Sequence, residues 1–169
     1  ETARLLFGAD RPEHGVIRLD GKPLKIKSPR DAIRQGICLL TEDRKTHGLV
    51  LGQTARENFG LPNLSQFASL GFIRQREESR EFLRYVDQIQ IKIADPEQIT
   101  GTLSGGNQQK IVLAKWLQRN AEVIIFDEPT RGIDVGAKYE IYQLINQLAQ
   151  QGKAILMISS ELTEILGMS

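Results

Sequence analysis

Cysteine, histidine and aromatic residues are scarce in this sequence of 169 residues. It has one cysteine, two histidines and 6% aromatic residues. Cys38 lies in the apolar run GICLL, so we predict a buried thiol without a redox or metal role, which fits a reducing cytoplasm. His14 and His47 lie in loop-like sequences without a partner at metal-ligand spacing, and we predict that both lie at the surface. A disulfide framework is therefore excluded.

Net charge and long apolar runs are also lacking. Lysine and arginine (22) nearly balance aspartate and glutamate (21), which gives no electrostatic reason to expect nucleic acid as a partner. The longest apolar runs, VIIF and AILMI, fall far short of the roughly 20 residues of a spanning helix, and no signal-peptide pattern opens the chain. We therefore expect a soluble domain, which could still dock on a membrane protein.

A phosphate-binding loop of the form G-x-x-x-x-G-K-[ST] is absent as well. The nearest run, GLVLGQT from Gly48 to Thr54, has one residue too few between its glycines and glutamine in place of lysine, so we predict an ordinary loop. Heptad repeats, internal repeats and low-complexity segments are missing too. A nucleotide bound by these residues would need its main phosphate cradle from elsewhere.

The elements that are present indicate an α/β fold. Residues 15–27 alternate around Asp20-Gly21 and predict an antiparallel hairpin. Ser28, Pro29 and Gly36 mark the cap, first turn and stop of a short helix before the strand ICLLT. After residue 100 we predict a helix over 105–118, the strand EVIIFDEP, a helix over 137–149, the strand KAILMIS and a last helix, hence parallel strands with right-handed crossovers.

Between these parts, residues 42–100 are rich in charge and frame the helical sequence RQREESREFLRYVDQIQI. Phe82, Val86 and Ile89 recur in it at helical spacing, so we predict a helical insertion. We interpret the charges from Arg74 to Arg80 as the solvated face of this helix. Trp116 and Leu117, behind the next helix start, are predicted to belong to the core.

Two carboxylates, Asp127 and Glu128, end the strand VIIFDEP. The carboxyl ends of parallel strands are where open α/β folds bind ligands. In nucleotide hydrolases the first carboxylate orients Mg²⁺, and the second accepts the proton of the attacking water. The plainer alternative is that both residues end a strand and cap a turn.

The stretch LSGGNQQK, residues 103–110, suits a phosphate group. Gly105 and Gly106 allow close approach of the backbone, while Ser104 can cap the helix and donate its hydroxyl. The first amides of a helix also carry the positive end of its dipole. Ser-Gly-Gly alone is equally typical of a flexible turn.

The combination of motifs is far more specific. LSGGNQQK, then VIIFDEP, TRGID and ILMISSEL in that order resemble the signature, Walker B, D-loop and switch of ABC transporter nucleotide-binding cassettes. LSGGNQQKIVLAKWL and DEPTRGIDVGAKYEIY are similar to the second cassette of bacterial ribose- or galactose-type importers. The resemblance implies a partial P-loop-type cassette over residues 1–169, cut at both ends, with a helical subdomain over about 42–118.

The resemblance also implies roles for individual residues. Asp127 would bind Mg²⁺, and Glu128 and Ser160 would be catalytic. The residues expected to contact ATP are Ser104, Gly105, Gly106, Asn107, Gln108, Asp134 and Thr41. ETARLLFG at the start corresponds to the helix that follows the family's phosphate loop, which would lie outside this chain.

Two positions depart from the family pattern. Ser160 stands where a histidine normally contacts the γ-phosphate, and Thr41 stands where the Q-loop normally has glutamine. Both weaken the case for hydrolysis at this cassette's own site, although Glu128 is retained. The sequence does not decide whether that site turns over ATP.

The resemblance implies the ATP-binding subunit of a sugar importer at the cytoplasmic face of the bacterial inner membrane. Its partners would be the first cassette, of the same or a neighbouring chain, the permease subunits and, indirectly, a periplasmic sugar-binding protein. Cassettes pair head to tail, so this signature would complete the partner's ATP site. One alternative is a DNA-repair or chromosome-maintenance ATPase, against which the missing heptads argue. Another is a non-catalytic module that docks on the permease.

Overall fold

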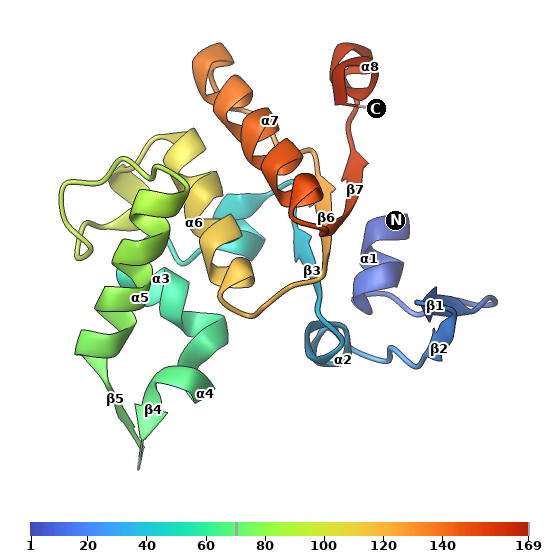
Figure 1. The fold of residues 1–169 in the computed structure, drawn as a ribbon, viewed down its shortest axis with the longest axis horizontal. Helices are drawn as coiled ribbons and strands as arrows, with labels where there is room; N and C mark the ends of the chain where they lie inside the picture. Colours follow the sequence, from blue (N-terminus) through green and yellow to red (C-terminus); the bar gives the residue numbers. More distant parts are fainter. Residues whose placement is uncertain (70, 169) are drawn as a thin grey trace.

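A three-stranded parallel sheet lies at the centre of the computed structural model, which describes residues 1–69 and 71–168 (Figure 1). Its strands are β3 (Ile37–Leu40), β6 (Val123–Asp127) and β7 (Ala154–Ile158), in the order β3-β6-β7. Ile37 pairs with Val123, which pairs in turn with Ala154. The predicted parallel arrangement is therefore confirmed, and all three strands end at the same edge.

The N-terminal part follows the predicted pattern. After α1 (Thr2–Phe7), β1 (Ile17–Leu19) and β2 (Lys22–Leu24) form the antiparallel hairpin. In α2 (Pro29–Arg34) the Ser28 side chain caps the helix by accepting from the Asp31 amide, and Gly36 follows with φ of +74°. These local signals were sufficient because each one concerns only its neighbours in the chain.

Helices dominate the segment between β3 and β6. Its elements are a π-helix (Arg44–Gly48), α3 (Ala55–Gly60), a 3-10 turn (Leu61–Asn63), α4 (Leu64–Phe67), β4 (Ala68–Ser69), β5 (Phe72–Ile73), α5 (Gln75–Gln88), a second 3-10 turn (Thr100–Thr102) and α6 (Gly105–Leu117). In Figure 1, α3, α4 and α5 gather away from the sheet, with α6 between them and the strands. The helix predicted within RQREESREFLRYVDQIQI is confirmed as α5. The segment after Gly48 is irregular until Thr54 caps α3, as predicted.

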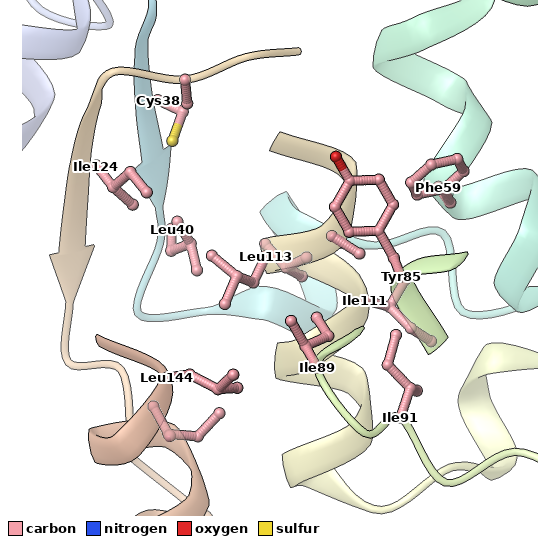
Figure 2. Packing of buried hydrophobic residues seen from close by; sticks show 14 of the residues in the cluster. Cys38, Leu40, Phe59, Tyr85, Ile89, Ile91, Ile111, Leu113, Ile124 and Leu144 are labelled. Atoms are coloured by element: carbon pink, nitrogen blue, oxygen red, sulfur yellow. The ribbon is translucent and has the colours of Figure 1, made fainter. Parts of the chain in front are cut away.

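One continuous apolar core joins the helical segment to the sheet. Figure 2 shows Ile111 and Leu113 of α6 between the strand residues Cys38 and Leu40 on one side and the ring of Phe59 on the other. Cys38 is 1% exposed, so the predicted burial of this side chain is confirmed, and burial raises the pKa of its thiol to about 12. α6 is therefore the element through which the two halves of the chain pack together.

The C-terminal part consists of α7 (Val135–Gln150) and α8 (Leu162–Met168) on either side of β7 in the chain. Ile141, Leu144, Ile145 and Leu148 form the buried stripe of α7, at the helical spacing visible in the sequence. Among the described residues, no helix combines the length and apolarity needed to cross a membrane.

The solvated-face interpretation of Arg74–Arg80 is wrong at one position. Glu78 is 2% exposed and forms an ion pair with Arg56 of α3, which also binds Glu97. Burial raises the pKa of Glu78 in spite of the Arg56 guanidinium. A buried carboxylate requires such a partner. Helical periodicity could not reveal this one, because Arg56 is 22 residues away from Glu78 in the sequence.

Candidate nucleotide site

The carboxyl edge of the sheet brings two predicted catalytic residues together. Glu128 follows β6 with φ of +50°, and its amide donates to the carbonyl oxygen of Ile158 at 2.9 Å. The Ser160 hydroxyl then donates to Glu128 Oε2 at 3.1 Å. Parallel pairing of β6 with β7 thus places the half-buried Glu128 carboxylate and the exposed Ser160 hydroxyl side by side.

Asp127 and Thr41 lie at a cavity beside the same edge of the sheet. Both line a cavity of about 400 Å³ between α1 and the segment after β3, together with Arg4 and His47. The Thr41 hydroxyl donates to the carbonyl oxygen of Asp43 at 3.2 Å. The described residues contain no group of three or more histidine, cysteine, aspartate or glutamate side chains that could hold a metal ion. Mg²⁺ at phosphoryl sites typically takes one or two carboxylates plus phosphate oxygens, a role that Asp127 fits.

The start of α6 forms a separate polar surface. Ser104 is the N-cap of this 13-residue helix, and its Oγ accepts from the Asn107 amide at 3.5 Å and from Asn107 Nδ2 at 3.0 Å. The first amides of any helix lack partners within the helix, and the dipole adds positive potential there. This turn can therefore hold an anion with a hydroxyl and backbone amides.

The two glycines of the sequence LSGGNQQK are needed for packing. A Cβ on Gly106 would lie 2.8 Å from the Cβ of Ala137 in α7, and one on Gly105 would lie 2.5 Å from a guanidinium nitrogen of Arg44. Both contacts are closer than ordinary van der Waals distance. The glycines therefore let α7 and the segment after β3 approach the start of α6.

Asp134 lies beside the signature. It is the N-cap of α7, where its side chain accepts from the Ala137 amide at 3.0 Å. Ser104, Gly106, Asn107 and Asp134 line one cavity of about 220 Å³. The structure thus groups four of the predicted ATP-contacting residues around one space, whereas Thr41 lines a different cavity.

Gln108 differs from its neighbours in the signature. Its side chain is buried, with 4% exposure of the residue, and Nε2 donates to the carbonyl oxygens of Thr100 and Leu103, both at 3.2 Å. The structure therefore does not bring this side chain to the cavity. It stabilises the turn that precedes Ser104 by binding two of the carbonyl oxygens of that turn.

Sequence reasoning missed Arg44. The residue is 8% exposed. Its guanidinium lies next to Gly105 and donates to the carbonyl oxygens of Arg131 at 3.0 Å and Gly132 at 3.4 Å. It therefore ties the segment after β3 to the D-loop and the signature. No local pattern marks an arginine that binds carbonyl groups nearly ninety positions away.

Glu164 of α8 was also missed. This 5%-exposed residue accepts from the hydroxyls of Thr130, Tyr142 and Ser159. Burial raises the pKa of its carboxyl, but these hydrogen bonds and the Lys138 charge outweigh burial and hold that pKa below its ordinary value. The sequence ILMISSEL places Ser159 near Glu164, but it does not reveal that the more distant hydroxyls of Thr130 and Tyr142 donate to the same carboxylate.

Comparison with known families agrees with this geometry. The family model described as ABC transporter matches residues 2–131, which include the signature turn, β6 and the carboxylates that follow it. This chain belongs to the ABC transporter family.

Curated ABC relatives match over the entire chain. The ribose import ATP-binding protein RbsA of Geobacillus kaustophilus is 52% identical over 169 residues, and that of Bacillus subtilis is 50% identical. In each case the match covers 100% of this chain and 34% of the relative. The chain therefore spans about a third of the length of these curated relatives.

Solved ABC cassettes have the same fold. A nucleotide-free ATP-binding cassette from an ABC transporter superposes with a TM-score of 0.82 at 19% identity, covering 98% of this chain and 67% of the other. A dimeric cassette bound to ADP and Pi gives 0.75 at 20% identity, with 96% and 69% coverage. The predicted fold class, a mostly parallel cassette with an antiparallel hairpin and helices, is confirmed.

Proposed function

We propose that the protein containing this chain is the ATP-binding subunit of a bacterial importer for ribose, galactose or a similar monosaccharide. Residues 1–169 would belong to its second cassette, with the helical subdomain over about 42–118. The names of the relatives, ribose import ATP-binding proteins, support the substrate class. The grouping of α3, α4 and α5 away from the sheet, with α6 between them and the strands, supports the subdomain.

The observation that carries this proposal is the cavity at the start of α6. Ser104 Oγ, the amides of Gly105, Gly106 and Asn107, and the helix dipole would contact the γ-phosphate of ATP, with Asp134 at the rim. ATP supplies the phosphoryl group whose transfer to water drives transport. The phosphate loop for this nucleotide would come from the first cassette, in the same or a neighbouring chain.

The sheet edge would form this cassette's own site. Asp127 would hold Mg²⁺, Glu128 would accept a proton from water, and Thr41 would line the site. Ser160 donates to Glu128 and carries no charge of its own, so it would orient the carboxylate without neutralising the γ-phosphate. We therefore propose that turnover here is slower than at the site completed by Ser104.

The assembly follows from the same proposal. The subunit would lie at the cytoplasmic face of the inner membrane, bound to permease subunits and indirectly served by a periplasmic sugar-binding protein. Pairing with a second cassette is supported by the dimeric cassette that shares this fold. Nucleic acid is not a proposed partner, because the chain carries nearly balanced charge.

Ser104→Ala in the complete importer tests the proposal. We expect the ATPase rate to fall by about 10-fold or more, as when one preorganised donor to a transition state is removed. Ser65→Ala, at an exposed serine of α4, is the control and should leave the rate unchanged. Equal rates for Ser104→Ala and wild type would support the alternative, a module that docks on the permease without handling nucleotide.

A further inference from the structure

Three charged side chains meet behind the signature. Glu140 of α7 binds Lys92 through Oε1 at 3.1 Å and Lys110 of α6 through Oε2 at 2.7 Å. Lys110 is 2% exposed, and a buried ammonium is stable only if acceptors replace its lost water. The half-exposed Glu140 is therefore the counter-ion of the buried Lys110 ammonium.

This cluster holds the segment that touches Asn107. Lys110 Nζ also donates to the carbonyl oxygen of Gln90 at 2.7 Å, two residues before Lys92. The backbone amide of Lys92 donates to Asn107 Oδ1 at 2.8 Å, and Asn107 Nδ2 donates to Ser104 Oγ at 3.0 Å. A continuous series of contacts therefore runs from Glu140 to the signature serine.

The donors along this series fix the direction of every bond. A backbone N–H can only donate, so the Asn107 side chain must present its oxygen to Lys92 and its NH₂ group to Ser104. Because Ser104 Oγ accepts from that NH₂ group, the hydroxyl hydrogen is left to donate elsewhere. The remaining direction is the 220 Å³ cavity, which Ser104, Asn107, Lys92 and Glu140 all line.

We propose that Glu140 is a positioning residue that aims the Ser104 hydroxyl into the cavity through Lys92, Lys110 and Asn107. The proposal rests on the proposed function, because it assumes that Ser104 donates to a phosphate there. The cluster also carries a net charge, because two lysines and one glutamate leave one positive charge beside the proposed anion site. In this role Glu140 acts through its neighbours, because a carboxylate has no hydrogen to donate to a phosphate.

The test uses Glu140→Gln and Glu140→Asp in the complete importer, with Glu122→Gln as the matched control. Glu122 is an exposed glutamate that pairs with Lys153 at 3.1 Å, the same distance as between Glu140 and Lys92, and it precedes β6 at the far end of the strand. For Glu140→Gln we expect kcat to fall by about 10-fold while KM for ATP changes by less than about 2-fold, because the first cassette's phosphate loop makes the initial contacts. Glu140→Asp should recover part of kcat, and Glu122→Gln should match wild type.

Combining Glu140→Gln with Ser104→Ala separates positioning from general damage. Residues that act in series are not additive, so Glu140→Gln should cost nothing further once Ser104 is alanine. An equal loss in both backgrounds, or a loss that appears in KM alone, would overturn the positioning role. A wild-type rate in the Ser104→Ala single variant would instead contradict the proposed function, so the two failures are distinguishable.

Discussion

Lys115 is a buried lysine outside the site. It lies within α6 at 7% exposure, and its ammonium donates to the carbonyl oxygen of Gly48. Burial lowers the pKa of this lysine from 10.5 to about 8. A charged group that is deprived of water in the folded state makes folding depend on pH.

We predict that Lys115→Met removes part of the pH dependence of stability. Below about pH 8, Lys115 of the wild type is protonated in both the folded and the unfolded state, so folding bears the full cost of burying the charged ammonium. Between about pH 8 and 10.5 the unfolded state binds more protons, so the wild type gains up to about 3 kcal/mol relative to the variant. Urea unfolding at pH 7 and pH 10 measures this difference. Lys45→Met, at an exposed lysine, is the control, and parallel pH profiles of Lys115→Met and wild type would refute the prediction.

At the scale of residues, the sequence was informative where a role depends on neighbours in the chain. Ser104 and Asp134 cap the helices that follow them, as their residue types suggested. Gln108 shares the signature but its side chain is buried, because the helical turn directs it inward. That direction depends on where α6 packs, which no short motif specifies.

At the scale of elements, the crossing of α6 and α7 depends on one glycine. A Cβ on Gly106 would lie 2.8 Å from the Cβ of Ala137, so the two helices approach more closely than a side chain at position 106 would allow. We predict that Gly106→Ala lowers the free energy of unfolding by about 1–3 kcal/mol, as overpacking typically does. Denaturant titration measures the loss.

Two further variants complete this experiment. Ala137→Gly removes the opposing methyl group and should restore part of the stability of Gly106→Ala, less the roughly 0.5–1 kcal/mol that glycine costs in a helix. Gly136→Ala is the control, because its Cβ would lie 3.5 Å from Asp134 Oδ1, an ordinary contact. A Gly106→Ala protein as stable as wild type would mean that the crossing is looser than the structure indicates.

Outside residues 42–73 the elements were largely predictable from the sequence, and their bounds shifted by only a few residues, whereas α3, α4, β4 and β5 were not predicted. The helices expected over 105–118 and 137–149 are α6 (Gly105–Leu117) and α7 (Val135–Gln150). The π-helix at Arg44–Gly48 was not predicted, since TEDRKTHG has neither helical periodicity nor a helix-forming composition. Its Asp43 cap and the distant carbonyl partners of Arg44 stabilise it instead.

At the scale of the whole molecule, the Glu164 carboxylate connects α8 to α7, to the loop after β6 and to Ser159, which directly follows β7. We predict that Glu164→Gln lowers the free energy of unfolding at pH 7 by about 1–3 kcal/mol, because an amide can accept fewer of the converging hydroxyl bonds. The carboxyl pKa lies below its ordinary value, so this stabilisation is present above about pH 4.5 and is lost as pH falls through the folded-state pKa.

Thermal unfolding from pH 7 down to pH 3 measures this effect. The gap between wild type and Glu164→Gln should close at the acid end, whereas Glu77→Gln, at a glutamate on the surface of α5, should follow wild type throughout. A gap that persists unchanged at pH 3 would show that the carboxylate charge is not the source of the stability. The ATPase rate of the importer that carries Glu164→Gln is a second measurement, because Thr130, which binds Glu164, belongs to the loop beside the site.

The pairing of β3 with β6 has a consequence for how the chain folds. Ile37 meets Val123 only after the whole helical segment between them has been looped out, and closing a long loop costs conformational entropy before any sheet contact compensates it. The contacts among α3, α5 and α6 are closer in sequence and can form first, which shortens the effective loop. We therefore expect the sheet to be assembled late, with the helical segment as its template.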